Sequence, residues 1–101
     1  ELGITGTIVG HVGDGNFHVL PLFDPANPED MAKIDTFTSR LSRRAIAMDG
    51  TCTGEHGIGQ GKQKYLEPEL GSAAVSAMRL IKRALDPDLI MNPGKIFTME
   101  P

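Results

Sequence analysis

Two stretches near the start of the chain mix apolar and β-branched residues in the manner of strands. They cover residues 3–10 and 17–23, and the turn Gly-Asp-Gly-Asn lies between them. Runs of this kind bounded by glycine favour β-structure, so we expect two strands joined by a turn. Residues 51–53 are a weaker candidate for a third, short strand.

A long amphipathic helix is predicted over residues 28–49. Asn27 is a suitable N-cap, Pro28 suits the first helical position, and Glu29 and Asp30 suit the positive end of the helix dipole. Gly50 is expected to end the helix. Apolar residues then recur every three or four positions, at Met31, Ile34, Phe37, Leu41, Ala45 and Met48.

A second helix is predicted over residues 72–85, with Ser72 as its N-cap and a helical turn before it at residues 63–66. Asp86 precedes Pro87, which disfavours a further α-helical residue. The fold class predicted for the chain is therefore α+β, with a small antiparallel sheet of two or three strands and two main helices packed on it.

Length and composition predict one soluble globular domain that covers residues 1–101. The net charge of -3 and the absence of a Lys/Arg run argue against nucleic acid as a partner. Cys52 is the sole cysteine, which excludes an internal disulfide and a cysteine zinc knuckle. Because Glu1 leads directly into the first strand-like stretch, we expect the chain to be a piece of a longer protein.

Histidines stand at both ends of the first glycine-rich turn, His11 and His18, and a carboxylate, Glu55, lies in a second glycine-rich segment. Two imidazoles and one carboxylate form a common ligand set for a divalent transition metal. The spacing alone also allows two independent histidines. The metal hypothesis gains weight because every histidine of the chain lies in one of the two glycine-rich turns.

The second glycine-rich segment, Gly50–Lys62, carries Glu55 beside His56. An imidazole near neutrality suits a general base, although His56 as a third metal ligand or as part of a solvated surface loop remains open. The segment fits neither the P-loop, because Gln63 follows Lys62, nor the dinucleotide fingerprint, because Lys62 replaces its last glycine.

Three linked motifs, HVGDGNFH, GTCTGEHGIGQGK and LDPDLIMNPGK, resemble the C-terminal end of FAD-linked 2-hydroxyacid oxidases and dehydrogenases, which are flavoproteins of the vanillyl-alcohol-oxidase type. The resemblance covers residues 11–97. The version GTCTGEH is most similar to that of the cytochrome-linked D-lactate dehydrogenases, and differs from the SITGEH version of the glycolate oxidase D subunits.

The resemblance implies specific roles for residues of this chain. His11, His18 and Glu55 match metal ligands, with zinc as the expected ion, and His56 matches the proposed catalytic base. The expected contacts to FAD are Asn16, Gly54 and Asn92. Members that oxidise hydroxyglutarate carry Asn two residues after the second metal histidine. This chain has Leu20 there, which disfavours a long dicarboxylate substrate.

The resemblance further implies that an FAD domain and a cap domain lie elsewhere in the protein, which would oxidise a small D-2-hydroxy acid, D-lactate above all. Its electron acceptor would be a cytochrome, a quinone or an electron-transfer flavoprotein, and its location the cytoplasm or a membrane periphery, or the mitochondrion in a eukaryote. A glycolate oxidase-type subunit and a metal-binding module without redox activity are the alternatives. The 101 residues alone are expected to self-associate.

Overall fold

The computed structural model describes residues 2–100, and it begins with an antiparallel hairpin. Strand β1 (Gly6–Val9) pairs with β2 (His18–Pro21), in a register that runs from Gly6 opposite Pro21 to Val9 opposite His18. The short 3-10 helix η1 (Val12–Asp14) forms the turn. Both predicted strands are confirmed in shorter form, whereas residues 51–53 form no strand.

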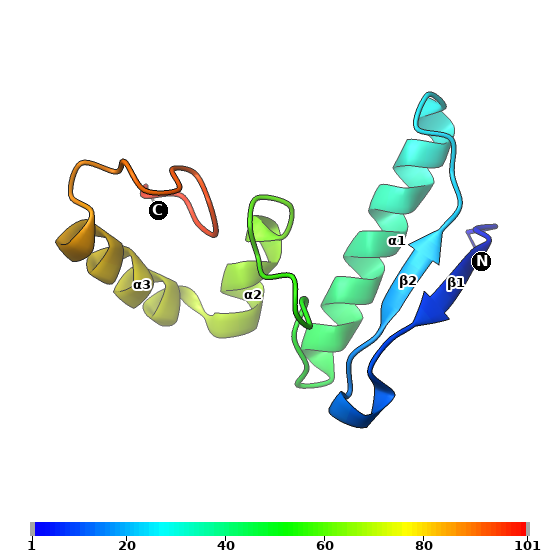
Figure 1. Ribbon diagram of the computed structural model, residues 1–101, viewed down its shortest axis with the longest axis horizontal. Helices are drawn as coiled ribbons and strands as arrows, with labels where there is room; N and C mark the ends of the chain where they lie inside the picture. The colour runs from blue at the N-terminus through cyan, green and yellow to red at the C-terminus, as the bar shows by residue number, and fades with distance from the viewer. Residues whose placement is uncertain (1, 101) are drawn as a thin grey trace.

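Helix α1 (Pro28–Ala47) lies alongside the hairpin (Figure 1). Its start is as predicted, because the Asn27 side chain accepts a hydrogen bond of 3.0 Å from the Glu29 N–H. Its end differs slightly, since Asp49 takes the left-handed conformation (φ 63°) that was expected of glycine. Gly50 is needed for a steric reason, because a Cβ there would lie 2.9 Å from the Ala45 carbonyl oxygen.

The second part of the chain is helical. A 3-10 turn η2 (Gln63–Tyr65) continues into α2 (Leu66–Leu70), and α3 (Ser72–Leu85) has the predicted bounds. The prediction of Ser72 as the N-cap is wrong, because Gly71 holds that position without a side-chain cap. Helix α3 packs against α2 on the side of the molecule away from the hairpin, so only α1 lies on the sheet (Figure 1).

Buried apolar residues are concentrated in one part of the fold. Among residues 2–100 the buried hydrophobic side chains are Cys52, Tyr65, Leu66 and Val75. The radius of gyration is 16.0 Å, compared with about 13 Å for a compact domain of 100 residues. The chain is thus a small α+β unit of open shape. None of the helices in the described part of the chain combines the length and apolar character needed to span a membrane.

Candidate functional site

The turn of the hairpin folds back tightly on itself. The His11 carbonyl accepts hydrogen bonds from the N–H groups of Asp14 (2.9 Å) and Asn16 (3.2 Å). A Cβ on Gly10 would stand 2.4 Å from the Phe17 Cα, so only glycine allows the two chain segments to approach this closely. This close approach places His18, the first residue of β2, at the base of the turn.

The second glycine-rich segment meets this turn directly. A Cβ on Gly54 would lie 1.9 Å from Asn16 Oδ1, so the Asn16 amide packs against the Gly54 backbone. Two of the three residues expected to contact FAD are therefore neighbours. The two motifs, far apart in the sequence, form one local structure at this point.

A cluster of His18, Glu55 and His56 forms where the two segments meet. His18 Nε2 and Glu55 Oε1 are 2.7 Å apart and share a hydrogen bond. His56 Nε2 lies 3.7 Å from the same carboxylate oxygen, and the two imidazole rings stand edge to face with centroids 5.3 Å apart. One ligand atom from each of the three residues lies within 4.8 Å of the other two.

His11, the other predicted ligand, is exposed at the start of η1 and is outside this group of three. It is still close enough to act on the carboxylate electrostatically. The hydrogen bond from His18 is the main cause that lowers the pKa of Glu55 below its ordinary value, and the nearby imidazoles of His18, His11 and His56 lower it further. Glu55 is therefore a carboxylate at neutral pH, the form that binds cations.

The donor set of the cluster fits a divalent transition metal. Imidazole nitrogen and carboxylate oxygen are ordinary zinc ligands, and His18 and Glu55 already lie within hydrogen-bonding distance. Exposure is graded across the cluster, since the side chain of His18 is 31% exposed and that of His56 is 75% exposed. His56 is thus the member of the cluster most accessible to a small molecule.

The second glycine-rich segment also offers an open surface to a larger ligand. A Cβ at Gly57, Gly59 or Gly61 would meet nothing within 4 Å, and Gly57 (φ 78°) and Gly59 (φ 52°) need the left-handed region. A flat ligand can approach such a backbone closely. Thr53 Oγ1 is buried without a hydrogen-bond partner among the described residues. These features fit the isoalloxazine and its polar edge.

Asn92, the third expected flavin contact, lies in the C-terminal turn, where it lines a pocket together with Met78, Ile81 and Leu85 of α3. Two hydrogen bonds tie this turn to the second glycine-rich segment and to the start of η2: the Ile96 N–H donates to the Gly59 carbonyl (2.6 Å), and Gln63 Nε2 donates to the Gly94 carbonyl (2.5 Å). Sequence reasoning missed both. A signal for Gln63 would have been its place directly after the glycine run.

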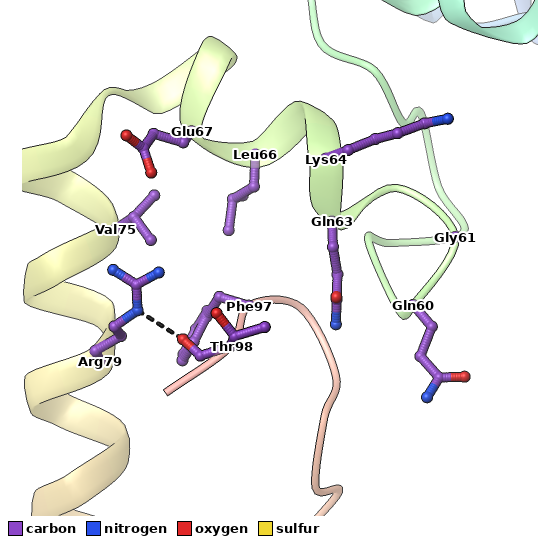
Figure 2. A pocket seen from close by; sticks show the side chains of 10 residues that line it. All are labelled: Gln60, Gly61, Gln63, Lys64, Leu66, Glu67, Val75, Arg79, Phe97 and Thr98. Atoms are coloured by element: carbon purple, nitrogen blue, oxygen red, sulfur yellow. Dashed lines mark hydrogen bonds between the residues drawn. The ribbon is translucent and has the colours of Figure 1, made fainter. Parts of the chain in front are cut away.

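A pocket of about 540 Å³ lies between α2, α3 and the C-terminal tail (Figure 2). Arg79 borders it and donates from Nε to the Thr98 carbonyl, and Phe97 and Leu66 supply apolar surface. None of the predicted site residues lines this pocket. It is therefore separate from the histidine cluster.

The fold and the cluster describe a small α+β unit that presents imidazole and carboxylate groups beside an exposed glycine-rich backbone. A family model described as FAD linked oxidases, C-terminal domain, matches residues 1–96. The chain belongs to this family.

Curated relatives agree with this assignment. The chain is 54% identical over 95% of its length to the probable mitochondrial D-lactate dehydrogenase of Danio rerio, and 49% identical over 97% to the mitochondrial D-lactate dehydrogenase [cytochrome] 1 of Saccharomyces cerevisiae. It is 41% identical over 90% to the glycolate oxidase subunit GlcD of Bacillus subtilis. These matches cover only 19%, 16% and 19% of the relatives' own lengths.

Proposed function

We propose that this chain supplies the C-terminal part of the active site of a flavin-dependent dehydrogenase that oxidises a small D-2-hydroxy acid, D-lactate above all, to the 2-oxo acid. The observation that carries the proposal is the meeting of His18, Glu55 and His56 across 37 residues of sequence. Relatives named as D-lactate dehydrogenases and glycolate oxidase subunits support the same class of reaction.

FAD is the proposed redox cofactor, and when bound it supplies the acceptor for the hydride. Asn16 and Gly54 are proposed to meet it from the junction of the two glycine-rich segments, and Asn92 from the C-terminal turn. The packing of Asn16 on Gly54 holds the amide in one place. A preordered amide loses little conformational freedom when a ligand binds, which favours affinity.

His11, His18 and Glu55 are the proposed metal ligands, with zinc as the expected ion. A bound divalent cation would supply Lewis-acid polarisation of the substrate hydroxyl. The lowered pKa of Glu55 and the 2.7 Å approach of His18 support this set. Because His11 lies at the other end of the turn, His56 is a competing candidate for the third ligand. Experiment can distinguish the two histidines.

His56 is the proposed general base. Its exposed ring stands beside the ligand pair, so it can reach a hydroxyl held there. The hydroxyl proton passes to the imidazole while the α-hydrogen leaves with its electron pair. One proton and one hydride are lost in total, which gives the 2-oxo acid.

Substrate size is inferred from Leu20, which lies two residues after His18 in β2 and is 54% exposed. A leucine offers no hydrogen bond to a second carboxylate, so a short hydroxy acid is favoured over a dicarboxylate. Glycolate is the second candidate, because some relatives are glycolate oxidase subunits. A cytochrome is the first choice of electron acceptor, ahead of a quinone or an electron-transfer flavoprotein, and a mitochondrial location is proposed for a eukaryotic source.

The test is anaerobic reduction of the flavin in the full-length protein, followed by its absorbance. D-lactate is expected to bleach the flavin fastest, glycolate more slowly and D-2-hydroxyglutarate least. A full-length protein that is colourless but binds zinc would contradict the proposal and support a metal-binding module.

Two variants distinguish the role of metal ligand from the role of general base. His11→Ala is expected to abolish zinc binding measured by calorimetry, while His56→Ala retains zinc and FAD but slows flavin reduction by about 10²-fold to 10⁴-fold. The reverse pattern, with zinc lost only in His56→Ala, would make His56 the third ligand.

A further inference from the structure

The peptide groups on either side of Cys52 are held by two oppositely charged side chains. The Cys52 N–H donates to Glu69 Oε1 (2.9 Å), and the Cys52 carbonyl accepts from Lys62 Nζ (2.5 Å). The residue is only 7% exposed. A buried backbone group without water needs a protein partner, and here both partners are charged, which makes these hydrogen bonds stronger than neutral ones.

The two charged residues come from different elements. Lys62 is the last residue of the second glycine-rich segment, directly before η2, and Glu69 lies in α2. The Lys62 contact therefore closes residues 52–62 into a loop whose two ends touch, and the Glu69 contact fixes that closure to the helical part of the fold. Compact loops of this size with joined ends commonly carry functional residues.

The charges are arranged in the order that the backbone dipoles favour. The carboxylate faces the positive N–H end and the ammonium faces the negative carbonyl end. Lys62 is half-buried and directed at this carbonyl. An ammonium group held in this way is not available at the surface to bind a phosphate or a substrate carboxylate.

Glu55 and His56 follow Cys52 after only three and four residues. We propose that Lys62 and Glu69 are positioning residues that fix the Cys52 backbone and thereby the placement of Glu55 and His56 relative to His18. This inference rests on the proposed function, since it assigns the Cys52 clamp (Lys62, Glu69 and the Cys52 backbone) to the support of that site. Displacement of a reacting group by about 1 Å can reduce a rate by about 10²-fold.

The experiment uses the full-length protein with Lys62→Met and Glu69→Met, which keep the length of the side chains but remove the charges. Three quantities are measured: the rate at which a thiol reagent labels Cys52, the affinity for zinc alone, and the rate of flavin reduction by D-lactate. Labelling of any other cysteine in the full-length protein is subtracted by repeating each measurement in a Cys52→Ser background.

Both Met variants are expected to expose the thiol and so speed labelling. They are also expected to weaken zinc binding by about 10-fold to 100-fold, the range found when residues that orient metal ligands are changed. Flavin reduction slows while KM for D-lactate stays nearly constant. Lys62→Arg and Glu69→Gln, which retain a donor and an acceptor, restore most of each quantity.

Lys64→Met is the matched control. Lys64 lies two residues beyond Lys62, but its Nζ is directed to Asp35 (3.5 Å) and the Tyr65 ring. It is expected to leave all three quantities near those of the wild type.

Two results would overturn the inference. One is a raised KM in Lys62→Met with normal labelling and zinc affinity, which would mean that Lys62 binds substrate. The other is faster labelling with unchanged zinc affinity and flavin reduction, which would make the clamp structural only. If the wild-type protein bound no zinc, the metal role in the proposed function would be contradicted, and not the role of the Cys52 clamp. The rates of Cys52 labelling and of flavin reduction in the variants would then test whether the clamp positions the site.

Discussion

Residues 2–50, the N-terminal half, and residues 51–100, the C-terminal half, differ sharply in how they bury their side chains. The buried hydrophobic residues of the described chain all lie between Cys52 and Val75. The hairpin instead exposes Ile8 (73%), Val9 (57%) and Leu20 (54%). Among the described residues only the C-terminal half contains buried hydrophobic side chains, although α3 and the segment after it also expose apolar residues such as Leu80 (64%), Leu85 (79%) and Ile90 (75%).

The candidate site is built from residues of both halves. His18 comes from the exposed hairpin, and Glu55 and His56 come from the loop that the Cys52 clamp joins to the core. The contacts between the halves include the hydrogen bond between Ser39 Oγ and Tyr65 OH (3.0 Å), the Arg43 guanidinium over the Tyr65 ring, and the Lys64–Asp35 ion pair. The geometry of the site thus depends on how firmly a weakly buried hairpin is held against a better-supported loop.

The largest effect is expected when the chain is prepared alone as residues 1–101. The exposed apolar face and the open edge of a two-stranded sheet favour pairing with a second copy. We expect self-association by light scattering, no tight FAD binding and no oxidation of hydroxy acids. A stable monomer at high concentration would contradict the first expectation, and a yellow sample bleached by D-lactate would contradict the others.

Gly10→Ala is expected to have the next largest effect, because it disturbs the close approach of the two chain segments at the base of the hairpin turn. The new Cβ would lie 2.4 Å from the Phe17 Cα and 2.5 Å from the Asn16 carbonyl oxygen, and neither backbone atom can move aside freely. Overpacking of this kind costs about 1–3 kcal/mol. Urea unfolding of the full-length protein should show that loss, together with weaker zinc binding.

Gly13→Ala provides the matched control in the same turn. A Cβ there would meet nothing within 4 Å, so the unfolding midpoint should stay close to that of the wild type. Equal losses in both variants would mean that the turn tolerates no side chain for reasons other than space.

Local signals predicted the elements well and the packing less well. The Asn27 cap and the bounds of α3 depend on residues next to one another in sequence, and both are confirmed. That α3 packs on α2 and leaves the sheet to α1 depends on contacts across the chain, which periodicity does not contain. Ser72 was misplaced as a cap because Gly71 takes a positive φ of 88° and occupies that position itself.

The site shows the same limit. Spacing alone could not establish that His18 and Glu55 meet across 37 residues. The ligand set of two histidines and a carboxylate suggested it, and the family resemblance implied it. Which second imidazole lies nearest to the pair, His56 or His11, depends on the path of the turn. Glu69 was missed because a carboxylate on a short helix carries no motif. The FAD, metal and base roles remain predictions for the experiments above.

Tyr65→Phe tests the polar contact between the halves and is expected to have a moderate effect. Tyr65 is fully buried, and its hydroxyl bonds to Ser39 on α1. Removing one such hydrogen bond costs about 1 kcal/mol. Ser39→Ala should cost a similar amount, and the double variant should cost little more than either single one. Additive losses in urea unfolding would show that the two residues act independently.

The smallest effect concerns pH and the C-terminal half alone. The Asp86 carboxylate is buried and accepts hydrogen bonds from Lys82 Nζ (2.5 Å) and from the N–H groups of Ile90 (3.0 Å) and Met91 (2.9 Å). The Lys82 contact is the main cause that lowers the pKa of Asp86 below its ordinary value, and the two backbone donors add to it.

A lowered pKa in the folded state fixes the direction of the pH dependence. The unfolded chain binds the proton first as pH falls, so the stabilisation by Asp86 is complete above its ordinary pKa of about 4 and is lost as pH falls through the lower folded value. In urea unfolding, the free energy of unfolding of the wild type should exceed that of Asp86→Asn at pH 7 and pH 5. The difference between the two should become smaller near pH 3. Asp88→Asn, at an exposed position in the same turn, is the control and should show no such narrowing. A constant gap down to pH 3 would mean that Asp86 stabilises the turn through its shape and not through its charge.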